Sequence, residues 1–366
     1  MLKILFIIDH LGCGGAERIT LQLAEYLAKN KNHIIHLAVL NGKANYHFPS
    51  TNITYTDLDL SESFAFGKMW KDKKLNASEI IRLNQLLLNN FDLIVTGYNN
   101  GHWLGPYLKG NVWHWIHGDL LEIRPQNNLF KKMKEQIRFA KNKRKFKKLF
   151  SNRNIITVNR DLENKTRLYA NIQECQTIAN GVEIPTDLLN KYIYSQKKWD
   201  TIFVGRLAPI KQVDHAIQAF AQSGLKGKMA IIGDGSERKN LEKLTKELNI
   251  TDHIEFLGWV NNPLDYINNS RSLILTSHYE SYGLVLAEAI SLNTPVIAYN
   301  TSSGINDIFC CNTMHEFLIE SNNIDLLALK LKKLVDHPYK ISHEIIKNIN
   351  IKKTAENFIN LAKKRN

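Results

Sequence analysis

The 366-residue sequence has little cysteine and no long hydrophobic run, and both shortages limit what it can be. No CxxC pair occurs among its four cysteines, which argues against a disulfide framework and a thiolate zinc site (Cys13, Cys175, Cys310, Cys311). The N-terminal stretch MLKILFIIDH is too short for a secretory signal, and no run of about 18 apolar residues is present to span a membrane. We therefore expect a chain of the reducing cytosol.

What the sequence does contain is a sizeable core and an excess of positive charge. It is 44% hydrophobic and has a formal net charge of +13. At roughly 150 residues per domain, this length and composition predict about two globular domains. They exclude a disordered, a collagen-like or a coiled-coil protein.

The positive charge is concentrated in residues 131–153, which hold eleven Lys and Arg against Glu135 alone. Apolar residues recur there at roughly helical spacing, among them Met133, Ile137 and Phe146. A basic amphipathic helix over 131–150 suits an anionic membrane surface or an acidic lipid-linked substrate. A solvated helix that packs its apolar side on its own domain is the plainer alternative. Nucleic acid is disfavoured as a partner because no nucleic-acid motif accompanies the charge.

Short apolar runs alternate with helical patterns, which predicts an α/β fold with parallel sheets covered by helices. In the first half we expect a helix from about 16 to 29 and strands at 3–9, 34–40, 92–97, 112–117, 154–159 and 176–180. In the second half we expect strands at 200–206, 228–234, 253–258, 272–277 and 295–299.

These elements predict two doubly wound domains of similar size. The first covers residues 1–182 and includes the basic helix, and the second covers residues 200–349. Weak periodicity and a proline make 183–199 the expected linker, and a helix over 350–366 can cross back to the first domain. Ligands of open α/β sheets bind beyond the carboxyl ends of the strands, so the chemistry is expected in the loops after each strand.

The first such loop lies in DHLGCGGAER, between a strand and a helix. Gly14 and Gly15 allow the backbone to approach a ligand, and the free N–H groups of the helix start favour an anion. The dinucleotide pattern GxGxxG is not met because its third position is Glu17, so an NAD site is disfavoured. A turn with only a packing role remains the alternative.

GRLAPIKQ places Arg206 and Lys211 just beyond a strand of the second half. Two cations there can neutralise a diphosphate and stabilise it as it departs, Arg through a planar fork and Lys as a point charge. Because surface Arg and Lys are common at strand ends, this pair alone is weak support for a site.

SHYESYGLVLAEAI has the form E-x7-E, with Glu280 in a loop and Glu288 about two turns into a helix that starts near Tyr282. Carboxylates accept hydrogen bonds from vicinal hydroxyls, so one can hold a ribose and the other a hexose. The N–H groups near Tyr282, Gly283 and Leu284 can take a phosphate. Solvated acids at a helix start are the ordinary alternative, but burying an unpaired Glu288 would be costly.

The histidines do not predict a metal site. His114 and His117 lie three residues apart in a strand, as do His33 and His36, so the members of each pair point to opposite faces. His117 stands at a strand end beside Gly118 and is the better candidate for an active site. A hydrogen-bonded core histidine is the alternative.

Six segments, taken in order, resemble the motifs of the retaining glycosyltransferases of family 4. They are GGAER, the NG of IANGVEIP, GRLAPIKQ, IGDGSERKNLE, FLGWV and ESYGLVLAEAISLNTPVIA. The resemblance covers most of the chain and is strongest from about 200 to 310. It implies the GT-B fold, with two Rossmann-like domains facing a central cleft. It also implies a nucleoside diphosphate sugar as co-substrate, with no cofactor and no metal.

The resemblance assigns a role to each matching residue. It implies that Glu280 lies near the transferred sugar, that Glu288 holds the nucleotide ribose, and that Arg206 and Lys211 hold the diphosphate. His117 would sit over the donor sugar. The implied catalytic set is therefore His117, Arg206, Lys211 and Glu280.

The remaining implied donor contacts are mostly backbone groups. Gly14 and Gly15 would line the phosphate and acceptor side of the site. Gly258 and Val260 would contact the nucleobase, and the 282–284 turn would bind a phosphate. Asp57-Leu58-Asp59 resembles the DxD metal motif of the other major glycosyltransferase fold. We expect it to be a chance match in a loop, because no strand and acidic cluster accompany it.

The expected activity is transfer of a hexose or N-acetylhexosamine from a nucleoside diphosphate sugar, UDP-linked by preference. The expected acceptor is a glycan or lipid-linked glycan of lipopolysaccharide, capsule or related surface polysaccharide synthesis. Residues 131–153 would then hold the protein peripherally on the inner face of the cell membrane. A nucleotide-sugar epimerase of the same architecture, and an inert homologue that binds nucleotide sugar or membrane, remain as alternatives.

Overall fold

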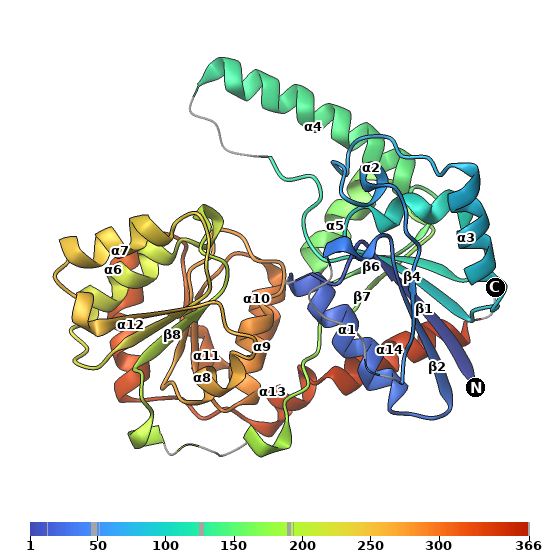
Figure 1. The fold of residues 1–366 in the computed structure, drawn as a ribbon. Helices are drawn as coiled ribbons and strands as arrows, with labels where there is room; N and C mark the ends of the chain where they lie inside the picture. Colours follow the sequence, from blue (N-terminus) through green and yellow to red (C-terminus); the bar gives the residue numbers. More distant parts are fainter. Residues whose placement is uncertain are drawn as a thin grey trace. The chain divides into compact units, whose positions relative to one another are not determined.

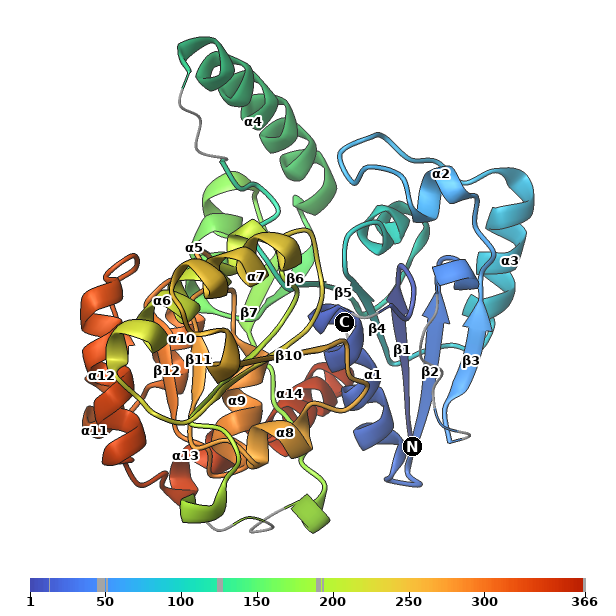
Figure 2. The same ribbon diagram turned by 60° about the vertical axis from the view of Figure 1, so that its left-hand side comes forward.

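The computed structural model describes residues 1–12, 14–44, 50, 52–123, 128–188, 192 and 194–364. Cys13 and part of the expected 183–199 linker lie outside these residues. The chain divides into two compact units (Figures 1 and 2). Unit 1 comprises Met1–Asn180 and Ile351–Asn366, and unit 2 comprises Gly181–Asn350.

Unit 1 is built on a seven-stranded parallel sheet in the order β3-β2-β1-β4-β5-β6-β7. Its strands are β1 (Leu2–Ile8), β2 (His33–Val39), β3 (Thr54–Asp57), β4 (Leu93–Gly97), β5 (Val112–Ile116), β6 (Asn154–Thr157) and β7 (Glu174–Thr177). Six of them begin and end within three residues of the predicted runs. The seventh, β3, is an edge strand of sequence TYTD with no buried residue, so it has no apolar run to reveal it.

The helices of unit 1 are α1 (Gly15–Ala28), α2 (Glu62–Ala65), α3 (Ala77–Leu87), α4 (Leu129–Phe150), α5 (Arg160–Tyr169) and α14 (Ile351–Lys363). The C-terminal helix α14 packs beside α1 on this sheet (Figure 1). Its buried Phe358 contacts Phe6 of β1 and Trp115 of β5, with ring centroids 5.9 and 4.8 Å apart. Burial of this aromatic side chain explains why the last helix belongs to the first unit.

Helix α4 joins the unit 1 core only through its C-terminal half. Phe146, Leu149 and Phe150 are buried in the hydrophobic core, whereas the beginning of the helix extends away from the sheet (Figures 1 and 2). The predicted basic helix is thus present from Leu129 to Phe150, with Asn128 capping it through a side-chain bond to Phe130 N.

Unit 2 is built on a six-stranded parallel sheet in the order β10-β9-β8-β11-β12-β13. Its strands are β8 (Thr201–Val204), β9 (Met229–Ile232), β10 (Ile254–Gly258), β11 (Leu273–Leu275), β12 (Val296–Tyr299) and β13 (Leu318–Ile319). Its helices are α6 (Val213–Ser223), α7 (Arg238–Glu247), α8 (Leu264–Asn268), α9 (Leu284–Ser291), α10 (Ser303–Ile308), α11 (Asn312–His315), α12 (Ile324–Asp336) and α13 (His343–Asn348).

The described residues of 183–199 pack on unit 2. Trp199 is buried and forms a β-bridge with Ser270, and Lys197 donates from Nζ to Ser270 O at 3.0 Å. Burial lowers the pKa of Lys197 to about 8. These contacts make the described part of this segment an integral piece of unit 2.

The strand order reverses once in each sheet, and this is where an open α/β sheet binds its ligand. In unit 1 the reversal lies between β1 and β4, and in unit 2 between β8 and β11. None of the helices described by the structure is long and apolar enough to cross a membrane.

Candidate active site

At the unit 2 reversal point the structure brings together two of the predicted site residues. Lys211 follows β8 and Glu280 follows β11, and Lys211 Nζ lies 2.5 Å from Glu280 Oε2. Both side chains remain about one-fifth exposed, so the pair is accessible to a ligand. Arg206, also after β8, is exposed. Two cations and one carboxylate therefore stand beside the crevice where the sheet topology predicts a ligand.

The loop that bears Lys211 is fixed to the neighbouring strand by hydrogen bonds. Pro209 starts a 3₁₀ turn, Pro209–Lys211, and Gln212 adopts a left-handed φ of 43°. The Thr276 hydroxyl at the end of β11 donates to Gln212 O at 2.7 Å, and His278 N donates to Ile210 O at 2.8 Å. These two bonds hold the backbone before and after Lys211. They therefore preorganise its side chain toward Glu280.

Glu288 lies nearer to the helix start than expected. Helix α9 begins at Leu284, so Glu288 is about one turn into it rather than two. The delay comes from Gly283, which caps the helix with a left-handed φ of 80° that glycine adopts without strain. Glu288 is only 3% exposed, and Tyr282 beside the cap is also buried, which raises the pKa of its phenol.

The segment IGDGSERKNLE resembles a family motif, but its two glycines, Gly233 and Gly235, which shape the same edge of unit 2, were assigned no role from the sequence. A Cβ on Gly233 would lie 1.9 Å from Gly205 O, and a Cβ on Gly235 would lie 2.2 Å from Leu207 O. Both have φ values in the region that glycine favours, 129° and 158°. The GDG loop thus packs backbone to backbone against the loop that bears Arg206. Its glycine pair was the available signal.

Gly258 belongs to this group of loops. It ends β10 with a left-handed φ of 70°, and its carbonyl accepts a hydrogen bond from Gly233 N at 2.8 Å. Trp259, the next residue, is 56% exposed, and Val260 follows it half-buried. Gly258 and Val260, the predicted nucleobase contacts, thus lie at the same carboxyl edge of the sheet as Arg206 and Lys211. The exposed Trp259 stands between Gly258 and Val260 in the sequence.

At the unit 1 reversal point a buried carboxylate ties the loops together. Asp9 follows β1 and accepts hydrogen bonds from Asn100 N and Gly101 N, both beyond β4, at 2.9 and 2.8 Å. Burial raises the pKa of Asp9 to about 7. Asp9 was not singled out from the sequence, because only the strand order shows that its loop and the 98–101 loop are neighbours.

The predicted glycine turn follows Asp9. Gly14 caps α1 and Gly15 is its first residue. A Cβ on Gly14 would lie 2.3 Å from the Glu17 carboxylate, which is itself buried. A larger residue at position 14 would have to displace the Glu17 carboxylate, which fills the space beneath the turn.

His117 has the environment of a site residue, whereas His114 does not. His114 is buried in the sheet and bonds through Nδ1 to Thr96 Oγ1 at 2.6 Å, so it is a hydrogen-bonded core histidine. The His117 ring packs on Trp115, and among the described residues neither of its buried nitrogens has a hydrogen-bond partner. Burial lowers the pKa of His117 to about 3. An imidazole left without partners in this way requires an explanation, and a ligand supplies one.

In the part of the chain that the structure describes, no group of three or more His, Cys, Asp or Glu side chains is placed to hold a metal ion. His36 bonds to Thr56 Oγ1 at 2.7 Å. Asp57 was expected in a loop but is the last residue of β3, where its carboxylate accepts from Gly42 N and Asp59 N. It therefore stabilises a turn.

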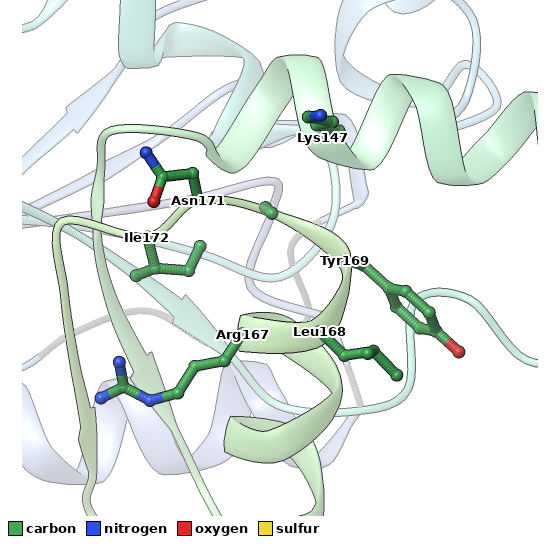
Figure 3. Close-up of a pocket in the computed structure, with 7 residues that line it drawn as sticks. Lys147, Arg167, Leu168, Tyr169, Asn171 and Ile172 are labelled. Atoms are coloured by element: carbon green, nitrogen blue, oxygen red, sulfur yellow. The ribbon is translucent and has the colours of Figure 1, made fainter.

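A surface pocket of about 420 Å³ in unit 1 lies away from these residues (Figure 3). Lys147 of α4 and Arg167 of α5 are among the residues that line it, with Tyr169 and Ile172. Because α5 leads into β7, the pocket lies near the amino-terminal edge of the sheet, whereas Asp9 and His117 lie at the carboxyl edge. It is not part of the candidate active site.

Comparison with known proteins gives a consistent picture. Residues 187–353 match the family model described as glycosyl transferases group 1. An uncharacterized glycosyltransferase of Haemophilus influenzae is 31% identical over 158 residues, 42% of this chain and 44% of that protein, so the match spans less than half of that relative. A Campylobacter jejuni protein is 24% identical over 92% of this chain and 91% of its own length. Its name is N-acetylgalactosamine-N,N'-diacetylbacillosaminyl-diphospho-undecaprenol 4-alpha-N-acetylgalactosaminyltransferase.

Solved structures match residues of both units. Sucrose-phosphate synthase from Thermosynechococcus elongatus has a TM-score of 0.75 at 17% identity and covers 99% of this chain and 98% of its own. Anabaena HepE in complex with UDP-glucose has a TM-score of 0.68 at 15% identity, with 98% and 99% covered. These likenesses confirm the predicted fold class. Two parallel Rossmann-like sheets give the chain the GT-B fold, and residues 187–353, a little under half of the chain, match the glycosyl transferases group 1 family.

Proposed function

We propose that the protein transfers a hexose or N-acetylhexosamine from a UDP-sugar to a hydroxyl of a glycan or lipid-linked glycan, with retention of anomeric configuration. The observation that carries the proposal is the contact between Lys211 and Glu280 beside exposed Arg206 at the reversal point of the unit 2 sheet. A cation pair beside one carboxylate suits a ligand that is anionic at one end and rich in hydroxyls at the other.

The cations act on the leaving group. As the bond between the sugar and the diphosphate breaks, negative charge develops on the diphosphate. Arg206 and Lys211 stabilise that charge, together with the N–H groups at the start of α9. Because Lys211 is held by its turn, little reorganisation is needed during the reaction. The same charge would otherwise call for a metal ion, so we propose that no metal is required.

The carboxylates orient the donor. Glu280 accepts hydrogen bonds from hydroxyls of the transferred sugar, and its contact with Lys211 holds the carboxylate in position for that task. Glu288 is assigned to the ribose. Gly258 and Val260 are assigned to the nucleobase, which exposed Trp259 can cover with its indole ring.

Unit 1 contributes His117 and the glycine turn. The unpartnered, neutral imidazole of His117 can donate a hydrogen bond to the donor sugar. Gly14 and Gly15 leave backbone N–H groups open on the phosphate and acceptor side.

Two relatives support the choice of substrates. Anabaena HepE is described with UDP-glucose, and the Campylobacter jejuni relative is named for a diphospho-undecaprenol substrate and for transfer of N-acetylgalactosamine. We extend both to this chain as proposals: a UDP-linked donor, and an acceptor of lipopolysaccharide, capsule or a related surface glycan. A lipid-linked acceptor agrees with the positive charge of residues 131–153, which we propose to hold the protein peripherally on an anionic membrane at its cytoplasmic face.

The test is incubation with a panel of UDP-sugars and undecaprenyl-diphosphate-linked glycans. The anomeric configuration of the product is read by NMR, and Lys211→Ala serves as the inactive control. A single α-linked product from an α-linked donor, formed without added metal, supports the proposal. Isomerised donor without acceptor would establish an epimerase instead. UDP binding without turnover of any donor would establish an inert homologue.

A further inference from the structure

Helix α4 has two apolar faces, and among the residues that the structure describes only one of them is buried. The buried face contains Phe146, Leu149 and Phe150 in its C-terminal half. In its N-terminal half four large apolar side chains are exposed: Leu129 by 81%, Phe130 by 64%, Met133 by 61% and Ile137 by 54%. We call these four residues the apolar ridge.

The apolar ridge is a continuous stripe. At roughly 100° per residue, its four members fall within an arc of about 100°, and that arc points almost opposite to the buried face. The ridge therefore points away from the described part of unit 1 on which α4 packs. The first part of the helix also extends away from the sheet (Figures 1 and 2).

Along the helix, the same outward arc changes from apolar to basic side chains. Beyond the ridge it is continued by Arg144, Lys147 and Lys148, of which Lys147 also lines the pocket with Arg167 (Figure 3). Among the residues that the structure describes, no carboxylate forms an ion pair with these three cations. One face of α4 thus offers large apolar side chains at one end and unpaired cations at the other.

Lysines of the basic segment that do have partners lie on other faces of the helix. Lys145 donates to Trp70 O at 2.6 Å, and Lys143 stacks over the Tyr169 ring at 4.6 Å. These contacts belong to unit 1 itself. The basic charge of residues 131–153 is therefore divided between internal contacts and the outward arc.

From these observations we propose that the apolar ridge inserts into the acyl boundary of an anionic lipid bilayer, while Arg144, Lys147 and Lys148 contact its headgroups. Large apolar side chains supply insertion, and cations supply selectivity for anionic lipid. The occupant is a membrane rather than an acidic protein, because an acidic partner would be matched by the cations and not by four exposed apolar side chains. The inference deepens the membrane association proposed above and assigns insertion to residues 129–137 only.

The experiment is flotation of the full chain with vesicles of phosphatidylcholine, with and without phosphatidylglycerol. Phe130→Ser/Met133→Ser/Ile137→Ser removes most of the ridge. The matched control, Ile81→Ser/Leu88→Ser/Leu329→Ser, replaces side chains that are 58%, 78% and 65% exposed outside α4. We expect partitioning of the ridge variant to fall on the order of 100-fold, and that of the control to stay near wild type.

A second variant separates charge from insertion. Arg144→Gln/Lys147→Gln/Lys148→Gln is expected to lose the preference for phosphatidylglycerol and the salt dependence of binding. Phe130→Trp should show a blue-shifted emission and quenching by brominated acyl chains that Leu88→Trp does not show. An unchanged midpoint of thermal unfolding, measured without ligand, verifies that each variant is folded.

Two results would overturn the inference. The first is flotation of the ridge variant to the same extent as wild type, which would leave charge alone as the cause of binding. Alternatively, lipid-free protein could self-associate through the ridge, seen as a dimer that the ridge variant loses and that never binds vesicles. Neither result depends on transferase activity, so a protein that binds vesicles but transfers no sugar would refute the proposed function and leave the membrane site intact.

Discussion

Lys211 and Glu280 meet at 2.5 Å, although 69 positions separate them in the sequence. Their loops follow β8 and β11, which are neighbours at the point where the strand order of unit 2 reverses. The contact joins a group proposed for the diphosphate to a group proposed for the sugar. Loss of either side chain should therefore disturb both ends of the donor.

We expect Lys211→Ala to lower kcat by about 100-fold or more, the usual effect of removing one group that stabilises a developing negative charge. Glu280→Gln should also lower kcat, because an amide keeps the shape but not the charge that pairs with Lys211. Steady-state kinetics with a UDP-sugar measures both. Lys239→Ala, at an exposed lysine of α7, is the control and should behave as wild type. Equal activity of Lys211→Ala and the control would remove Lys211 from the mechanism.

The loop that carries Glu280 depends on close backbone packing. A Cβ on Gly304 would lie 2.2 Å from Ser281 O, whereas a Cβ on Gly205 would meet only the Phe203 ring, at 3.4 Å. Gly304→Ala should therefore destabilise unit 2 by about 1–3 kcal/mol and weaken UDP binding, because the 280–284 loop must shift. Gly205→Ala should lower the free energy of unfolding by less. Urea unfolding and UDP titration of both variants measure the difference, and equal stabilities would show that the loop yields freely.

Acid should weaken unit 1 through its buried histidines. Burial gives His102 and His117 pKa values of about 3 and holds the pKa of His114 well below its usual value. Below about pH 6.5 the unfolded chain binds protons that the folded chain does not. The free energy of unfolding therefore falls by up to about 1.4 kcal/mol per pH unit for each histidine.

Asp9 acts in the opposite direction. Its pKa is raised to about 7 by burial, so between about pH 7 and pH 4 the folded chain holds a proton that the unfolded chain has lost. Its contribution to stability grows as the pH falls, and it offsets part of the effect of the histidines. Asp9→Asn should remove this offset and make acid destabilisation steeper. Urea midpoints at several pH values test the sign, and a shallower curve for Asp9→Asn would contradict it.

Activity should not depend on a metal ion. Asp57 and Asp59 are the sequence's nearest approach to a DxD motif, yet Asp57 accepts backbone hydrogen bonds at the end of β3. We expect EDTA to leave the rate unchanged, and Asp59→Asn to leave it unchanged as well. A rate that EDTA abolishes and Mg²⁺ or Mn²⁺ restores would require a different account of the leaving group.

Much of the fold could be predicted from the sequence, because a buried parallel strand is a short apolar run and a covering helix has its own period. The edge strand β3 was not predicted, because it buries none of its four residues and so has no apolar run. The start of α9 was misplaced because the conformation of Gly283, which no pattern reports, delays it by two residues.

The site residues were found one loop at a time, but their grouping was not. Which loops are neighbours depends on strand order, a property of long-range packing that local spacing does not contain. Only the sheet topology pairs Lys211 with Glu280 and places Asp9 beside Asn100. The two apolar stripes of α4 raised a similar difficulty, since the sequence shows where its apolar residues lie but not which of them the domain covers.

The central claim is that unit 2 binds a UDP-sugar through Lys211, Glu280 and Glu288, and the most direct measurement is thermal unfolding with UDP, GDP, ADP and their sugar conjugates. Wild type is compared with Glu288→Gln, with and without EDTA. A ligand at 100 times its Kd adds about 2.7 kcal/mol to the folded state, a shift of a few degrees. We predict a shift that is selective for UDP and a UDP-sugar, unaffected by EDTA and lost in Glu288→Gln. No shift with any nucleotide, or an equal shift in the variant, would contradict the claim.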